Sequence, residues 1–266
     1  MAAIDPMHQF LIHKVVDLPP VFGLDLSITN SVVTMMAGAL IICAFFALSA
    51  RKQIVPGRTQ AMGEMIYGLI DGVLVGPIMG HSGRPYVPFV FTIFMVVLVF
   101  NMMGIWLAVG NLAGFELTFT VTAQLACTVA LALLTFISVI IIGFLKNGLK
   151  FFSLFVPKGV PVFILPMMIL IEVISFVVRP LTLSMRLFGN MIGGHVVMYM
   201  FASFVVSLAV FALGGNLLGW PLAGVSFAMV VALTGLEMIV AFLQAFVFAA
   251  LTCVYLNEVV NLGHGH

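Results

Sequence analysis

The chain has 266 residues, of which 63% are hydrophobic and only 7% are charged. A soluble domain carries about 25% charged residues, so these few charges cannot cover a globular surface, and lipid must be the solvent for most of the chain. The net charge of +1, without a basic stretch to neutralise phosphates, excludes nucleic-acid binding. The three cysteines are dispersed within apolar runs, so we expect no disulfide framework, no metal site and no cofactor.

Three apolar runs in the first part of the chain are long enough to cross a membrane as helices, which takes about 20 residues. They cover residues 27–48, 86–109 and 119–145. The preceding residues, 1–26, are predicted to form a polar arm outside the membrane. Residues 59–80 contain Glu64, Asp71 and several glycines, and we expect them to form an amphipathic helix on the membrane surface.

Two longer apolar segments follow, at about residues 160–213 and 217–261, and glycines, an asparagine and a proline form the predicted turn between them. Each segment exceeds the length of one perpendicular crossing, so the two helices must be strongly tilted, bent or broken. Pro180 and the pair Gly193–Gly194 are candidate bends in the first of them.

Lysine and arginine clusters predict the orientation of the chain, because such residues favour the cytoplasmic side. One cluster follows the first span and the other follows the third: Arg51, Lys52 and Arg58, then Lys146, Lys150 and Lys158. The N-terminus is then outside and the C-terminus is cytoplasmic. The sequence thus predicts an all-α integral membrane protein with one membrane domain (1–266), in which the first three spans (27–158) precede a tilted helical hairpin (160–261).

A polar seam crosses the first long segment. Between Arg179 and Glu237 the only formally charged side chain is Arg186. Steps of three and four residues place the seam on one helical face, and its members are Glu172, Ser175, Arg179, Thr182, Arg186, Asn190 and Gly193. Because a charged side chain at bilayer depth costs at least about 2.5 kcal/mol, the seam must face protein or water rather than lipid.

A second polar set lies away from this seam. His195 is about half a turn round the helix from Arg186, and it points towards the last segment or a second cleft. In the last segment Glu237, Gln244, Tyr255 and Glu258 share one face. Glu237 is the natural partner for His195.

Simpler interpretations stay open for each of these residues. Arg186 could pair with a structural acid such as Glu172, while His195 and Glu237 could be satisfied core residues. Gln244 could be an interhelical hydrogen-bond bridge. A structural role is favoured for Asn101 and for Glu116.

These residues lie in motifs that resemble subunit a of the F-type ATP synthase. The main motifs are RPLTLSMRLFGNMIGGH (179–195) and LQAFVFAALTCVYL (243–256). Further matches are FVFTIFMVVLVFNMMGIW (89–106) and FFSLFVPKGVP (151–161). The opening DPMHQF, together with ITNS (28–31), is similar to the alphaproteobacterial branch, and the resemblance covers nearly the whole chain.

The resemblance implies a stator subunit that faces a rotating ring of c subunits. Arg186 would face the ring carboxylates and block direct proton leakage between two offset half-channels. Asn190 and Gln244 match polar residues near this arginine, and Glu172 matches an acid near the cytoplasmic exit.

In the same family an acid–histidine pair lines the outer half-channel. His195 and Glu237 would form that pair with its halves exchanged, as in mitochondrial and alphaproteobacterial members. The resemblance further implies b-type peripheral-stalk subunits as partners, no catalytic residue in this chain, and a bacterial inner or a mitochondrial inner membrane.

Two other classes of function were weighed. A secondary transporter could use Arg186 to bind an anionic substrate, but it predicts inverted repeats, and the sequence contains none that we can identify. An intramembrane enzyme would need a nucleophile or a metal cluster, for which the sequence has no motif.

Overall fold

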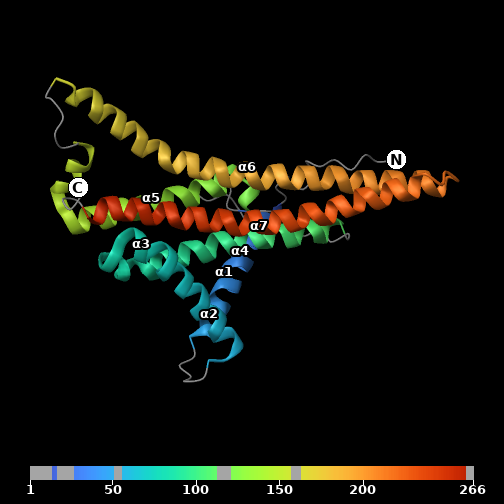
Figure 1. The fold of residues 1–266 in the computed structure, drawn as a ribbon, viewed down its shortest axis with the longest axis horizontal. Coiled ribbons are helices and arrows are strands. Elements are labelled where there is room, and N and C mark those ends of the chain that lie inside the picture. Colours follow the sequence, from blue (N-terminus) through green and yellow to red (C-terminus); the bar gives the residue numbers. More distant parts are fainter. Residues whose placement is uncertain (1–13, 17–26, 51–55, 113–120, 157–162, 262–266) are drawn as a thin grey trace. The chain divides into compact units, whose positions relative to one another are not determined.

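The computed structural model describes residues 14–16, 27–50, 56–112, 121–156 and 163–261 (Figure 1). The elements in chain order are β1 (Lys14–Val16), β2 (Ile28–Thr29), α1 (Asn30–Ser49), α2 (Arg58–Leu69), the π-helix η2 (Ile70–Val75), α3 (Gly76–Met79), the 3₁₀-helix η3 (Gly80–Tyr86), α4 (Val87–Leu112), the 3₁₀-helix η4 (Val121–Ala123), α5 (Leu125–Asn147), the 3₁₀-helix η5 (Gly148–Phe155), α6 (Leu165–Leu213) and α7 (Gly219–Val260).

Five helical stretches in the described part of the chain are long and apolar enough to cross a membrane. They are Asn30–Ser49, Arg58–Leu107, Leu125–Phe155, Leu165–Leu213 and Gly219–Val260. This confirms the predicted all-α integral membrane fold. Apart from residues 14–16, the N-terminal arm lies outside the described residues, as do Arg51, Lys52, Glu116 and Lys158.

The stretch expected to form one surface helix at 59–80 is helical but divided. It passes from α2 through η2 and α3 to η3 before α4 begins. Pro77 has no backbone N–H to donate and lies in the first turn of α3, while Gly80 has a φ of 59°. That positive φ is open to glycine at little cost, so the helix changes course there.

The two long helices α6 and α7 are each continuous, so they are not broken at the candidate bends. Pro180 lies inside α6, and the helix runs on through Gly193–Gly194 to Leu213. The turn falls in the predicted place, with Gly215 at a φ of 98°. At the start of α7 an added Cβ on Gly219 would lie only 2.7 Å from the Cα of Ala212, so glycine permits the close approach of the helices.

The described structure divides into two compact units, each drawn from three stretches of chain. Unit 1 comprises residues 1–40, 98–124 and 187–244, and unit 2 comprises 41–97, 125–186 and 245–266. Unit 1 thus holds the turn end of the α6–α7 hairpin, and unit 2 holds its open end.

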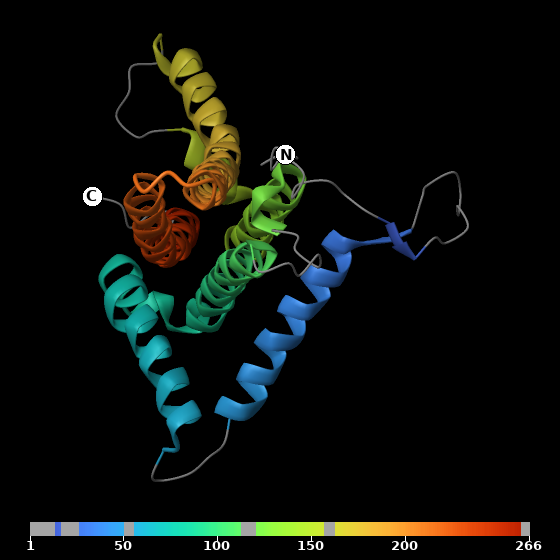
Figure 2. The same ribbon diagram turned by 90° about the vertical axis from the view of Figure 1, so that its right-hand side faces the viewer.

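A small antiparallel sheet precedes α1 in unit 1 (Figure 2). It pairs Lys14 with Thr29 and Val16 with Ile28. The sequence pattern does not predict this sheet, because a strand of two or three residues is too short to establish an alternating pattern.

Large apolar side chains lie exposed along the spans. On α5 the exposed fractions are 61% for Leu134, 52% for Ile141 and 82% for Leu145. A surface of this kind is costly in water and suits a lipid solvent.

Candidate functional site

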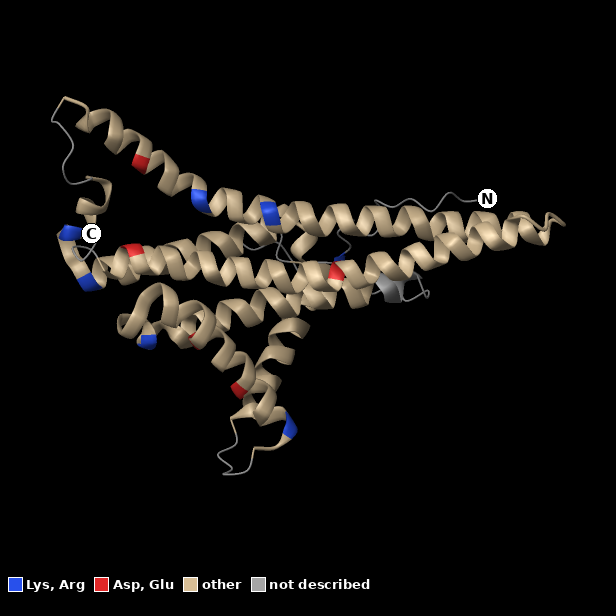
Figure 3. Ribbon diagram, in the orientation of Figure 1, with Lys and Arg blue, Asp and Glu red and all other residues tan. Residues whose placement is uncertain are grey.

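Charged side chains are sparse on the two long helices (Figure 3). Those of α6 are Glu172, Arg179 and Arg186, and those of α7 are Glu237 and Glu258. The surroundings of these charged side chains differ sharply between the two units.

Arg179 of unit 2 is held by two acids. Its Nη1 forms an ion pair with Oε2 of Glu258, and its Nη2 lies 3.8 Å from Oε1 of Glu172. The guanidinium also lies 5.0 Å from the ring centroid of Tyr255 and 5.7 Å from that of Phe176. Cation–π contacts add to ion pairing, so this arginine has a fixed place.

Aromatic packing fixes the helix turn that carries Arg179. The ring of Phe176 lies 4.8 Å from that of Phe136, 5.4 Å from that of Phe155 and 6.4 Å from that of Phe151. Such pairs contribute about 0.5–1.5 kcal/mol each beyond their burial. The cluster joins α5 and η5 to the first half of α6 within unit 2.

Arg186, two turns further along α6, is exposed and has no ion pair with a described residue. The other side of the helix packs inward at this level, with Ser184 fully buried and Leu187 only 1% exposed. Glu172, the acid that could have paired with Arg186, contacts Arg179 instead.

The rest of the predicted seam forms an exposed stripe on α6. Ser175, Thr182, Asn190 and Gly193 all lie on the surface, as does Arg186. Residues that the spacing of three and four places on one face of α6 thus lie on its exposed surface.

His195 lies on the opposite, buried stripe of α6 in unit 1. It is completely buried, together with Leu187, Met191 and Met198, whose exposed fractions are 3% or less. Neither ring nitrogen has a hydrogen-bond partner among the described residues. Buried polar atoms are usually bonded, so this histidine is an exception that calls for an explanation.

Glu237 of α7 lies directly against Gly194, the neighbour of His195. A Cβ added to Gly194 would overlap Oε1 of Glu237, and it would lie 3.1 Å from Cδ and 3.2 Å from Cγ. Both carboxylate oxygens are buried without a hydrogen-bond partner in the described structure. Thus α6 and α7 bring the predicted pair to neighbouring positions, but the two side chains are not hydrogen-bonded to each other.

Two further polar residues of unit 1 differ in their burial. Gln244 is partly exposed on α7. Asn101 of α4 is fully buried, and its Nδ2 donates to the carbonyl oxygen of Ala241 at 3.3 Å. This bond links α4 to α7, while Oδ1 of Asn101 is buried without a hydrogen-bond partner in the described structure.

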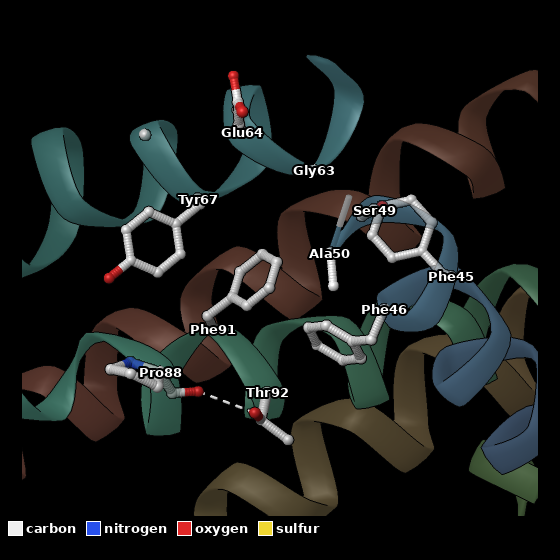
Figure 4. A pocket seen from close by; sticks show the side chains of 11 residues that line it. Phe45, Phe46, Ser49, Ala50, Gly63, Glu64, Tyr67, Pro88, Phe91 and Thr92 are labelled. Atoms are coloured by element: carbon white, nitrogen blue, oxygen red, sulfur yellow. Dashed lines mark hydrogen bonds between the residues drawn. The ribbon is translucent and has the colours of Figure 1, made fainter. Parts of the chain in front are cut away.

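A pocket of about 460 Å³ lies apart from these charges, within unit 2. It is lined by the end of α1, by α2 and by the start of α4, and the rings of Phe46, Tyr67 and Phe91 face its space (Figure 4). In its wall, Thr92 Oγ1 donates to the carbonyl oxygen of Pro88 at 2.8 Å. Its walls are mainly apolar and contain none of the predicted site residues.

Sequence reasoning missed two features of this region. The antiparallel hairpin places Arg179 and Glu258 at similar distances from the turn, but it does not show which faces of the two helices meet, so their ion pair was not predicted. Gly194 was considered as a bend, but its significance lies in the contact with Glu237 across the hairpin. A single sequence carries no signal for that contact.

The five long apolar helical stretches of the described chain define a multi-pass membrane protein. The sequence matches the family described as ATP synthase A chain over residues 31–257.

Similar proteins cover almost the same length. A protein named ATP synthase subunit a from Rhodopseudomonas palustris (strain TIE-1) is 46% identical over 262 residues, which is 98% of this chain and 100% of the relative. Proteins of the same name from Maricaulis maris and Azorhizobium caulinodans are 47% and 45% identical, covering 99% and 98% of this chain and 100% and 99% of the relatives.

The chain therefore belongs to the ATP synthase A chain family. This membership makes it a membrane subunit of an ATP synthase, with a part in proton transport and ATP synthesis within a complex of several subunits. The resemblance found in the sequence motifs is confirmed.

Proposed function

We propose that this chain is the stator subunit that guides protons to the c-subunit ring of an F-type ATP synthase through two offset half-channels. One observation carries the proposal: Arg186 is exposed on α6 without an ion pair among the described residues, whereas Glu172 and Glu258 both contact Arg179. A guanidinium at membrane depth needs a counter-charge. In this proposal the carboxylate of each passing c subunit supplies it.

The chemistry of arginine suits such a gate. In a low-dielectric interface the attraction between a guanidinium and a carboxylate is much stronger than in water. It favours the ionised carboxylate at the moment when the ring site faces Arg186. Because arginine keeps its proton where a buried lysine can lose it, the positive charge persists and opposes direct proton passage between the half-channels.

His195 and Glu237 form the outer half-channel in this proposal. Both side chains titrate in ranges that their surroundings can shift, and neither has a fixed hydrogen bond in the described structure. Such groups can take up and release protons without first breaking an internal bond. Compared with many bacterial members, the acid and the histidine have exchanged helices.

The inner half-channel leads from the ring to the cytoplasm past Glu172. Arg179 lies beside Glu172, with its Nη2 3.8 Å from Oε1 of that acid. Asn190 and Gln244 match the polar, hydrogen-bonding residues of the family's proton path.

The whole chain acts as one membrane domain in this account, with the hairpin of residues 160–261 facing the ring. The N-terminus lies outside and the C-terminus in the cytoplasm of a bacterial inner membrane. Partner subunits carry the catalytic chemistry, and b-type peripheral-stalk subunits keep this chain from turning with the ring.

Replacing Arg186 by alanine tests the proposal. ATP synthesis driven by an imposed proton gradient in liposomes with the complete complex should fall to background, because no fixed charge then separates the half-channels. The amount of assembled complex, measured by native electrophoresis, is the control. Normal synthesis in Arg186→Ala would contradict the role of this residue, whereas solute transport by the isolated chain in liposomes would favour a self-contained transporter.

A further inference from the structure

Gly194 and Gly193 are neighbours on α6 with different surroundings. A Cβ on Gly193 would have nothing within 4 Å, whereas a Cβ on Gly194 would meet three side-chain atoms of Glu237, all within 3.2 Å. The helix runs without interruption through both residues. The absence of a side chain at Gly194 is therefore needed for the approach of Glu237 and not for a bend.

The missing side chain leaves a notch in the surface of α6, at the turn that carries His195. Contacts between the two helices continue one turn further on, where Thr234 Oγ1 lies 3.6 Å from the sulfur of Met198. Both helices are thus closely packed on this side. Gly194 provides the local depth that lets the Glu237 side chain enter.

Packing, rather than hydrogen bonding, determines where the carboxylate lies. No described group donates a hydrogen bond to either oxygen of Glu237. A side chain without such bonds takes the position that the surrounding atoms leave free. The wall of that space on the α6 side is the backbone at Gly194.

We propose that Gly194 is a positioning residue for proton transfer, because its notch seats the carboxylate of Glu237 beside His195. This inference rests on the proposed function, in which Glu237 and His195 relay protons. Gly194 itself exchanges no proton, and it acts only by fixing the position of Glu237.

The notch also predicts how a substitution would act. The overlapping atom is the end of a flexible side chain, so Glu237 can move away from an added methyl group without disruption of the helices. Alanine has a higher helix propensity than glycine, so Gly194→Ala should assemble normally. Because Cδ and Cγ are also crowded, the whole carboxyl group has to shift, and not merely rotate.

The test compares Gly194→Ala in two backgrounds by ATP-driven proton pumping of the complete complex in liposomes. With Glu237 present, pumping should fall about 10-fold, as expected when a proton-transfer group is misplaced. In the Glu237→Asp background, whose shorter side chain does not reach the notch, adding Gly194→Ala should change pumping less than about 2-fold. Gly224→Ala on α7, where a Cβ would meet nothing within 4 Å, is the matched control and should pump normally.

Equal losses from Gly194→Ala in both backgrounds, or wild-type pumping by Gly194→Ala alone, would overturn the inference. A cryo-electron microscopy structure of the Gly194→Ala complex gives an answer independent of pumping: the carboxylate of Glu237 should leave the notch, and an unmoved carboxylate overturns the inference. Glu237→Gln separates this result from the underlying function. If that variant pumps normally, the proposed relay itself fails; if it does not pump while Gly194→Ala does, only the role of Gly194 fails.

Discussion

The ionisable groups at the two ends of the α6–α7 hairpin differ in whether they have bonding partners. At the open end, in unit 2, Arg179 contacts Glu172 and Glu258 and lies against the rings of Phe176 and Tyr255. At the turn end, in unit 1, the polar atoms of His195 and Glu237 are buried without hydrogen bonds to described residues.

The two ends of the hairpin are therefore suited to different roles. Paired and stacked charges are held in place, which suits a structural anchor. Groups without a fixed partner can change protonation without first losing an internal bond. Along α6, Arg186 lies between Arg179 and His195, and no acid of the described chain forms an ion pair with it.

The largest expected effect is that of Arg186→Lys. Lysine keeps the charge but lacks the planar fork and can lose its proton when buried, so we expect ATP synthesis to fall at least about 100-fold. Synthesis driven by a proton gradient in liposomes is the measurement. Arg179→Lys serves as the comparison and should retain most activity; similar losses in both variants would remove the contrast between the two arginines.

An intermediate effect is expected at the acids of α7. Glu237→Gln removes the acid of the proposed proton relay, so pumping should fall at least about 10-fold. Glu258→Gln should leave pumping largely intact but lower the stability of the complex by about 1–3 kcal/mol, because it weakens a charged hydrogen bond to Arg179. Proton pumping and thermal unfolding would be measured for both variants. The contrast between the two ends of the hairpin fails if Glu258→Gln stops pumping while Glu237→Gln does not.

The smallest effect concerns a glycine of unit 2. A Cβ on Gly143 would overlap Val259 and lie 2.9 Å from ring atoms of Phe151. Gly143→Ala should therefore destabilise the complex by about 1–3 kcal/mol through overpacking. Thermal unfolding measures the loss, and proton pumping per assembled complex should be unchanged. A changed pumping rate per complex would mean that packing at the open end affects transport directly.

Much of the fold could be predicted from the sequence because spans and turns have local signals. The lengths of the apolar runs predicted the five membrane helices, and the glycines and proline between the last two runs predicted the turn after Leu213. The spacing of three and four residues gave the exposed stripe with Arg186 and Asn190. Each of these depends on residues close together in the chain.

The contacts between helices could not be obtained in this way. The ion pair of Arg179 with Glu258 and the approach of Glu237 to Gly194 depend on which faces of α6 and α7 meet. That choice is made by packing over both helices, and no short motif encodes it. The division of residues 58–86 into four helical segments likewise depends on backbone geometry at Gly80.

Passive proton permeability of the membrane sector depends directly on whether Arg186 keeps the two proposed half-channels apart. Liposomes with the complete complex, whose catalytic head is blocked, would be compared for the wild type, Arg186→Ala and Arg179→Ala after a pH jump. We expect rapid proton leakage through Arg186→Ala alone, because in the proposed function only that arginine separates the half-channels. A tight Arg186→Ala complex, or an equal leak through Arg179→Ala, would contradict it.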